Sequence, residues 1–432
     1  MQNYPNKLFI YTEKNFLSIP QISLLNEEQV EAIRIVSRVL PFRVNSYVLD
    51  HLINWSNIPD DPIFQLTFPQ KKMLTAEHFQ RVNEALSKND NELLKRAIYH
   101  IRLGLNPHPA DQMTKNIPRI EGRQLKGFQH KYDETLLFFP ASGQTCHTYC
   151  TFCFRWAQFI GEKEFKFISH DLLGLKNYLK RNPQITDILI TGGDPLIART
   201  DKIKAYIDEI LKIESIRNIR IGTKALTYWP QRFTIDDDAD DLLRLFEKIV
   251  ESKKHLAIMA HYNHPNELQT KIAQDAVRRI GKTGSIIRSQ GPILAHINDS
   301  ANIWADLWKC QVSLGIIPYY MFVERDTGAQ DYFKVSLTSA LKIYKEAYNQ
   351  VTGLARTVRG PSMSTSPGKV MILDTLEINN KKYFVMEFIQ ARNKQNVGKL
   401  FFVDYDENAV WYDHLDIYLT RQIQSESIFM LS

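Results

Sequence analysis

From about residue 134 onward, short apolar runs alternate with stretches that carry apolar residues at helical spacing. Each run is nearly continuous in Leu, Ile, Phe and Met, which is typical of strands buried on both faces of a parallel sheet. Helices between such strands complete repeated β–α units. Six units predict an α/β fold with a partial (β/α)6 barrel, whose strands are "TLLFF" (135–139), "DILIT" (187–191), "IRIG" (219–222), "LAIMA" (256–260), "SIIR" (285–288) and "IPYYMF" (317–322).

Before the barrel, residues 1–130 are predicted to form a helical N-terminal region. Segments 26–40 and 89–105 carry apolar residues every three or four positions, the spacing of amphipathic helices. Between them, residues 57–70 ("NIPDDPIFQLTFPQ") are rich in Pro and Asp, which predicts a loop.

The barrel itself is predicted to occupy residues 131–355, with its chemistry on loops at the carboxyl ends of the strands. After it, two apolar segments flank "NNKK" (379–382), and a third follows at 398–406. Asn-rich turns between apolar segments indicate β-hairpins. Residues 356–432 are therefore predicted to form a small β-rich C-terminal cap.

Composition narrows the class of protein. The 432 residues are 44% hydrophobic and 24% charged, which excludes wholesale disorder. The net charge of +6 is spread along the chain, so it does not favour nucleic acid as a partner. No apolar stretch approaches the roughly 20 residues of a membrane span, and the first residues lack the apolar core of a signal peptide. These features predict a cytoplasmic protein without a membrane partner, in which clustered thiols indicate a metal or catalysis.

Three of the four cysteines, Cys146, Cys150 and Cys153, lie in one short segment with C-x3-C-x2-C spacing, just after the first barrel strand. Three thiolates so placed can hold one soft metal centre. Structural zinc usually takes four ligands, and Cys310 lies in a helical pattern where a core position is expected. The spacing favours an iron–sulfur cube with one open iron, and the alternatives are a partial zinc site or thiols with no shared role.

Phe152 completes the pattern C-x3-C-x-aromatic-C, which resembles the signature of the radical S-adenosylmethionine (SAM) enzymes. The longer segments resemble the lysine 2,3-aminomutase branch collinearly from about residue 40 to 375: "GFQHKYDETLLFFPASGQTCHTYCTFCFRW", "DILITGGDPL", "RIGTKALTYWPQR", "AHYNHPNE" and "IPYYMF". The resemblance implies a radical SAM barrel with a 4Fe-4S cluster on the three cysteines. It also implies that an electron from a donor such as flavodoxin or ferredoxin cleaves SAM to a 5′-deoxyadenosyl radical.

The segment "TGGDPL" follows the second strand, and its glycines let the backbone approach a ligand closely. In the resembling family this motif, here Gly192, Gly193, Asp194 and Pro195, holds the amino group of SAM. Polar residues at later strand ends match family positions near SAM or substrate, although each also has an ordinary structural interpretation: Thr223, Lys224, His261 and Gln290.

Arg155 lies two positions after the last cluster cysteine. A guanidinium offers a rigid bidentate fork for a carboxylate, and the matching arginine of the aminomutases grips the substrate α-carboxylate. The alternative is a cation that balances the charge of the cluster.

Two positions depart from the family pattern. The aminomutases hold pyridoxal phosphate on a lysine, and counting back from Pro361 places Arg356, a poor imine former, at that position. Lys369 is the alternative lysine. Arg325, with Asp326 beside it, stands where the lysine-specific enzymes carry an aspartate for the distal ammonium.

These departures predict a mouth lined by Arg325, Arg356 and Arg359, suited to an anionic or phosphorylated substrate, with ordinary surface charge as the alternative. The family's C-terminal zinc-binding cysteines are also absent from this chain.

The leading interpretation is a radical SAM enzyme on the aminomutase scaffold that takes hydrogen from a small carboxylate or amino-acid-like substrate without pyridoxal phosphate. One alternative is a pyridoxal-phosphate-dependent amino acid 2,3-aminomutase, an isomerase, that uses a non-standard lysine. An alternative from another class is a non-catalytic iron–sulfur electron carrier. The sequence leaves homo-oligomerisation, substrate and product open.

Overall fold

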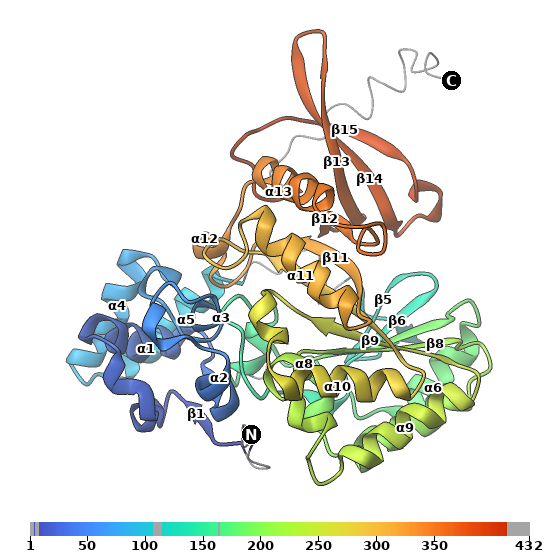
Figure 1. Cartoon of the computed structure of the whole chain (residues 1–432), viewed down its shortest axis with the longest axis horizontal. Helices are drawn as coiled ribbons and strands as arrows, with labels where there is room; N and C mark the ends of the chain where they lie inside the picture. The colour runs from blue at the N-terminus through green and yellow to red at the C-terminus, as the bar shows by residue number, and fades with distance from the viewer. Residues whose placement is uncertain (1–3, 5–7, 107–114, 163–164, 413–432) are drawn as a thin grey trace.

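The computed structural model describes residue 4 and residues 8–106, 115–162 and 165–412. Its main feature is an 11-stranded sheet in the order β15-β14-β13-β12-β11-β10-β9-β8-β7-β6-β5 (Figure 1). Six neighbouring strands are parallel and confirm the predicted α/β class and barrel strands: β6 Thr135–Phe138, β7 Asp187–Ile190, β8 Asn218–Thr223, β9 His255–His261, β10 Ile286–Ile293 and β11 Ile317–Val323.

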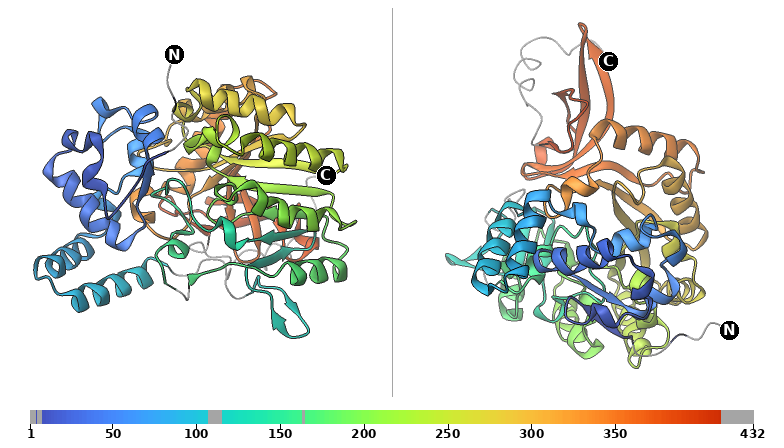
Figure 2. Two further views of the ribbon diagram at one scale, coloured as in Figure 1. Left: turned by 90° about the horizontal axis from the view of Figure 1, so that it is seen from below. Right: turned by 90° about the vertical axis from the view of Figure 1, so that its left-hand side faces the viewer.

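Helices connect these strands and cover the outer face of the sheet (Figures 1 and 2). Ile190, Ile221 and Ile258 alternate with inward-facing residues along their strands, and they pack in one core with Phe246 and Ile280 of the helices. The long connecting helices are α6 Leu172–Arg181, α7 Thr200–Leu211, α9 Ala239–Glu251, α10 Lys271–Lys282, α11 Ala301–Ser313 and α13 Leu337–Asn349, with short α8 Ala225–Tyr228 and α12 Gln330–Phe333.

The sheet continues past the barrel at both edges. β5 Phe128–Tyr132 is antiparallel to β6, and β12 Arg359–Ser364 is parallel to β11. The antiparallel strands that follow are β13 Gly368–Ile378, β14 Lys381–Ala391 and β15 Leu400–Asp404, and the β13–β14 hairpin rises away from the barrel (Figure 1). The strands of the predicted cap thus extend the barrel sheet, and a domain boundary at residue 356 stays a prediction.

The edge strand β5 contacts segments near the far side of the barrel through side chains. Lys131 of β5 donates to the backbone oxygen of Thr365, directly after β12. Lys394, after β14, pairs with Asp133, which follows β5. These contacts draw the open side of the partial barrel together, so its inner face is enclosed by β5 on one side and by β12 and β13 on the other.

The helical N-terminal region lies beside the barrel (Figure 2). Its helices are α1 Glu27–Val39, α2 Ser46–His51, α3 Pro62–Thr67, α4 Ala76–Ser87 and α5 Asn91–Gly104, and β1 Ile10–Thr12 pairs with β2 Arg43–Asn45. A small hairpin of β3 Arg119–Ile120 and β4 Arg123–Gln124 precedes β5. No helix in the described part of the chain is long and apolar enough to cross a membrane.

The prediction that residues 57–70 form a loop is wrong, because α3 lies within them. The Asp61 side chain accepts a hydrogen bond from the Phe64 backbone N–H at 2.7 Å, and Pro62 occupies the first helical position. Asp followed by Pro is a helix-start signal, since the carboxylate caps a free N–H and the proline ring already has a helical φ.

Candidate active site

The cysteine segment crosses the barrel mouth between β6 and α6, and the N-terminal region holds it in place. The guanidinium of Arg43 donates to the Thr145 hydroxyl and to the Cys146 backbone oxygen, both at 2.9 Å. Thr151 donates through its backbone N–H to the Leu66 oxygen at 2.9 Å. Residues of β2 and α3 therefore fix the path of the segment that carries the thiols.

Cys146, Cys150 and Cys153 are free thiols, and burial raises the pKa of Cys150 to about 12 and of Cys153 to about 11. Within the described ranges, no three His, Cys, Asp or Glu side chains converge closely enough to hold a single metal ion. An iron–sulfur cube differs from a single ion, because its thiolates bind separate irons.

Buried polar atoms around this segment have no hydrogen-bond partner among the described residues. They include Nη1 of Arg155, the hydroxyl of Thr148, the amide oxygen of Gln144 and both ring nitrogens of His147. Such orphans are rare in native proteins unless a ligand, ion or water supplies the partner. The three thiols and these orphans together fit a site built around an additional polar group.

The "TGGDPL" segment lies directly against the cysteine segment. Gly193 N–H donates to the Gly143 oxygen at 3.1 Å, and Asp194 N–H donates to the Thr145 oxygen at 2.9 Å. A Cβ at Gly193 would lie 2.5 Å from the Thr145 oxygen, so only glycine fits there. At Gly192 the φ of 150° is a glycine conformation. The glycines thus let the two backbone segments lie side by side.

The Asp194 carboxylate is not free, because it accepts several hydrogen bonds that stabilise this segment. It accepts from the Thr223 hydroxyl at 2.8 Å, from Lys224 N–H at 2.8 Å and from Leu196 N–H at 3.0 Å. Burial raises its pKa to about 6. Pro195 begins the short 3-10 turn that follows. Asp194 and Thr223 therefore join the ends of β7 and β8.

Lys224 also forms an ion pair inside the protein, with Glu267. Its ammonium donates to Glu267 Oε1 at 2.7 Å and to Asn263 Oδ1 at 2.9 Å, and the Glu267 side chain is fully buried. Burial of ions is costly unless they are paired in this way. Glu267 and Asn263 have no distinctive sequence pattern beyond "NHPNE", so sequence reasoning missed them.

The side chains of His261 and Gln290 contact each other at 2.7 Å between the two Nε2 atoms. Burial lowers the pKa of His261 to about 3, so its ring is neutral. His261 ends β9 as expected, whereas Gln290 lies within β10, which continues to Ile293. The expectation that Gln290 ends its strand is therefore corrected, although its side chain still reaches that of His261.

Arg155 and Arg325, far apart in sequence, meet at the mouth. Their Cζ atoms lie 5.0 and 5.1 Å from the centre of the Phe154 ring, and Arg155 also lies 4.5 Å from that of Phe139. Burial lowers the pKa of each arginine to about 10, and both remain charged at neutral pH. Phe152, by contrast, packs against Phe333 of α12.

Arg356 lies away from Arg155 and Arg325. Its side chain is exposed, donates to the Tyr348 oxygen at 3.2 Å and stands over the Tyr348 ring, at the amino end of β12. Its expected place at the mouth is wrong, because the chain reaches β12 across the opposite end of the barrel. Arg359 and Lys369 do lie inside, with Lys369 Nζ 4.0 Å from the centre of the Tyr320 ring.

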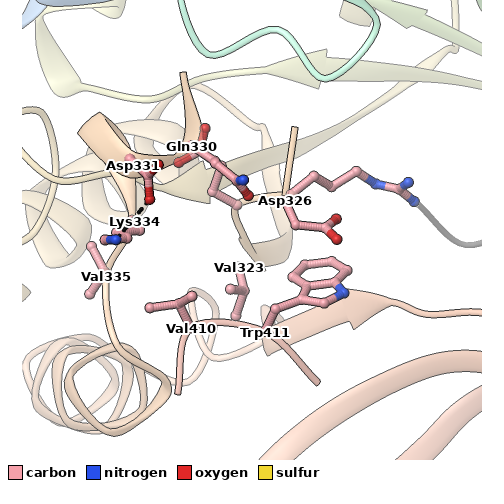
Figure 3. Close-up of a pocket in the computed structure, with 10 residues that line it drawn as sticks. Val323, Asp326, Gln330, Asp331, Lys334, Val335, Val410 and Trp411 are labelled. Carbon is pink, nitrogen blue, oxygen red and sulfur yellow. Dashed lines mark hydrogen bonds and ion pairs between the residues drawn. The ribbon is translucent and has the colours of Figure 1, made fainter. Parts of the chain in front are cut away.

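A cavity of about 140 Å³ lies beside the end of β11, lined by Val323, Glu324, Arg325, Asp326 and Trp411 among others. Figure 3 shows Asp326 beside the Trp411 ring. Both carboxylate oxygens of Glu324 are buried without a hydrogen-bond partner in the described part of the chain, and burial raises its pKa well above the usual range. Glu324 is a buried acid that sequence reasoning did not single out.

No protein-family model matches the chain. Over 401 residues it is 30% identical to the "Putative L-lysine 2,3-aminomutase" of Aquifex aeolicus, covering 93% of this chain and 94% of that protein. It is 24% identical over 241 residues to the glutamate 2,3-aminomutase of Clostridioides difficile, covering 56% and 54%. A crystal structure of Streptococcus suis SuiB with S-adenosylmethionine covers 60% of this chain and 49% of that one, at 13% identity and a TM-score of 0.36, too low to support an argument.

Proposed function

Because the chain belongs to the lysine 2,3-aminomutase family of radical SAM enzymes, we propose that it cleaves SAM reductively and takes a hydrogen atom from an amino-acid-like carboxylate. An electron donor and a small-molecule substrate follow from this proposal as partners. The observation that carries it is the contact between the cysteine segment and the "TGGDPL" segment, through Gly193 and Asp194.

The cofactors would be held by residues of this chain. Cys146, Cys150 and Cys153 would ligate a 4Fe-4S cluster, and the backbone oxygens around Gly192 and Gly193 would accept from the SAM amino group. Cluster and SAM together would supply a 5′-deoxyadenosyl radical. The protein contributes position and the exclusion of water, since α3, α12 and the cysteine segment pack in one core.

We infer that the substrate carries two anionic groups. Arg155 would hold one carboxylate, because its buried Nη1 has no other partner among the described residues. Arg325, on the same phenylalanine ring, would hold a second. An acidic amino acid satisfies both, and a relative is named glutamate 2,3-aminomutase. Lysine, with its distal ammonium, would face like charge at Arg325.

The test is production of 5′-deoxyadenosine by the anaerobically reconstituted, reduced protein with glutamate, aspartate or lysine. We expect an acidic amino acid to stimulate SAM cleavage, and the Arg325→Gln variant to raise KM for it about 10-fold or more. The Arg356→Gln variant is the matched control, because that arginine is exposed. Stimulation by lysine alone would refute the two-anion proposal. No SAM cleavage with any substrate would favour an electron carrier.

A second candidate is a pyridoxal-phosphate-dependent 2,3-aminomutase that uses Lys369. The sequence argument against the cofactor depended on Arg356, which lies on the surface. Lys369 instead points to the inner face, and its pKa lies well below the usual range because of burial and neighbouring cations. A neutral amine is the form that attacks an aldehyde. Borohydride reduction followed by peptide mass spectrometry would reveal a covalent adduct on Lys369.

A further inference from the structure

One buried hydroxyl beside the cysteine segment has no role in the chemistry above. Tyr228 ends α8, and its side chain is fully buried. Its ring packs in the same core as Cys150 and Cys153. Its hydroxyl has no aligned hydrogen-bond partner in the part of the chain that the structure describes. A buried O–H without a partner is rare in native proteins, so an acceptor that forms on ligand binding is expected nearby.

Strand β2 ties Tyr228 to the cysteine segment. Asn45 Nδ2 donates to the Tyr228 backbone oxygen at 2.8 Å. Two residues earlier on the same strand, the backbone oxygen of Arg43 accepts from the Tyr149 N–H at 2.9 Å, directly before Cys150. One short strand therefore fixes both the backbone that carries the hydroxyl and the backbone next to the thiol.

The Tyr228 ring is also held from its face. Lys224 Nζ lies 4.6 Å from the ring centre, and the ammonium is itself fixed by its ion pair with Glu267 at 2.7 Å. The Tyr228 N–H donates to the Lys224 oxygen at 3.0 Å. These contacts fix the ring, so the fold determines where the hydroxyl lies.

Cys150 and Glu267 both lie near this hydroxyl. Burial raises the pKa of Tyr228 well above its usual range, and the neighbouring Cys150 and Glu267 raise it further. Glu267 already has partners, because Oε1 accepts from Lys224 at 2.7 Å and Oε2 accepts from the Asn263 N–H at 2.5 Å. A neutral thiol is a weak acceptor, whereas a thiolate is a stronger one. The Cys150 sulfur therefore becomes the acceptor for this hydroxyl once it is a thiolate.

We propose that the Tyr228 hydroxyl donates a hydrogen bond to the Cys150 sulfur when that sulfur ligates the iron–sulfur cluster, and thereby raises the reduction potential of the cluster. Reduction transfers one electron from the electron donor to the cluster and breaks no bond, so the negative charge on the thiolate sulfurs increases. A donor that faces this charge stabilises the reduced form more than the oxidised form. Tyr228 acts through Cys150, as a positioning residue. The inference rests on the proposed function, because it requires the cluster on the three thiols.

The experiment is a redox titration of the reconstituted full-length protein without SAM, monitored by electron paramagnetic resonance. Wild type is compared with Tyr228→Phe, which removes one oxygen and keeps the ring. We expect the equilibrium constant for reduction to fall about 10-fold, or about 59 mV in potential for one electron. Tyr206→Phe is the matched control, because Tyr206 of α7 is also buried with an unpartnered hydroxyl but packs against Phe138. The control should keep the wild-type potential.

Two further readouts separate this role from simple packing. In protein without cluster the hydroxyl has no aligned partner, so Tyr228→Phe should melt at the wild-type temperature or slightly above it. Electron–nuclear double resonance of the reduced wild type should show a coupled proton that is lost in D2O and in Tyr228→Phe. Tyr228→Leu, which also removes the donor, replaces the phenylalanine variant if that variant fails to fold.

Equal potentials in wild type and Tyr228→Phe, at equal iron content, overturn the proposal, as does an equal drop in the Tyr206→Phe control. Failure of the proposed function gives a different result. In that case the potential depends on Tyr228, but the reduced protein leaves SAM intact with every substrate tested. Protein that takes up no cluster contradicts both.

Discussion

Replacing Gly193 by alanine tests the contact between the two segments that would hold cluster and SAM. The added Cβ would lie 2.5 Å from the Thr145 oxygen and 2.7 Å from the Thr145 nitrogen. Ordinary contact begins at 3.4 Å, so the cysteine segment or the "TGGDPL" segment must move by about 0.9 Å. The backbone hydrogen bonds from Gly193 and Asp194 to that segment would lengthen or break.

Loss of those two hydrogen bonds costs about 1–3 kcal/mol of folding stability. A shift of nearly 1 Å between reacting groups lowers rates by about 100-fold. We therefore expect Gly193→Ala to unfold at lower urea concentration and to form 5′-deoxyadenosine about 100-fold more slowly, with its iron content measured in the same samples.

The matched control is Gly281→Ala. Gly281 lies near the end of α10, and a Cβ there would meet nothing within 4 Å. Alanine in a helix is more favourable than glycine by about 0.5–1 kcal/mol, so the control should be as stable as wild type or slightly more so. Wild-type rates of SAM cleavage in Gly193→Ala would refute the argument that this close contact positions SAM.

Three further variants test the packing around the site. Lys224→Met leaves the buried Glu267 carboxylate unpaired and should cost about 3–5 kcal/mol in urea unfolding at pH 7, with partial recovery when Glu267→Gln is added; no recovery contradicts the pairing. Glu324 has a raised folded pKa, so the folded state retains its proton longer, and stability should fall as pH rises above the unfolded value of about 4.3, by up to about 1.4 kcal/mol per pH unit. Glu324→Gln should remove that slope, and parallel pH profiles of stability for the two proteins would count against it. Asp61→Ala removes the cap of α3 and should cost about 0.5–2 kcal/mol, measured by thermal melting, whereas an unchanged melting temperature would show that the cap is not needed.

The sequence predicted the barrel strands well because each is a short apolar run, and the outer face of a parallel sheet must be apolar to pack against helices. The same apolar pattern did not show which polar side chains lie on the inner face of the sheet. Arg220 and Arg288 interrupt apolar runs only once each, and only strand register shows that they face the same interior as Arg359. Helix α3 was missed because Pro and Asp were interpreted as loop residues.

The candidate site was predictable only where its residues lie close together in the sequence. The three cysteines and the two glycines are in short motifs, and the structure brings those motifs into contact. The proximity of Arg155 and Arg325 depends on the curvature of the whole sheet. Arg356 was misplaced because it lies in the connection from α13 to β12, before the amino end of a strand that runs parallel to β11, and its place relative to the strand ends depends on the fold. The roles of the site residues stay predictions.

Anaerobic reconstitution with iron and sulfide, followed by reduction with SAM and assay for 5′-deoxyadenosine, tests the proposed function at its chemical core. We predict about four irons per chain, a reducible 4Fe-4S signal in electron paramagnetic resonance, and SAM cleavage that disappears in Cys146→Ala, Cys150→Ala and Cys153→Ala. Zinc alone at these thiols, or intact SAM under strong reductant in a protein that carries the cluster, would contradict it.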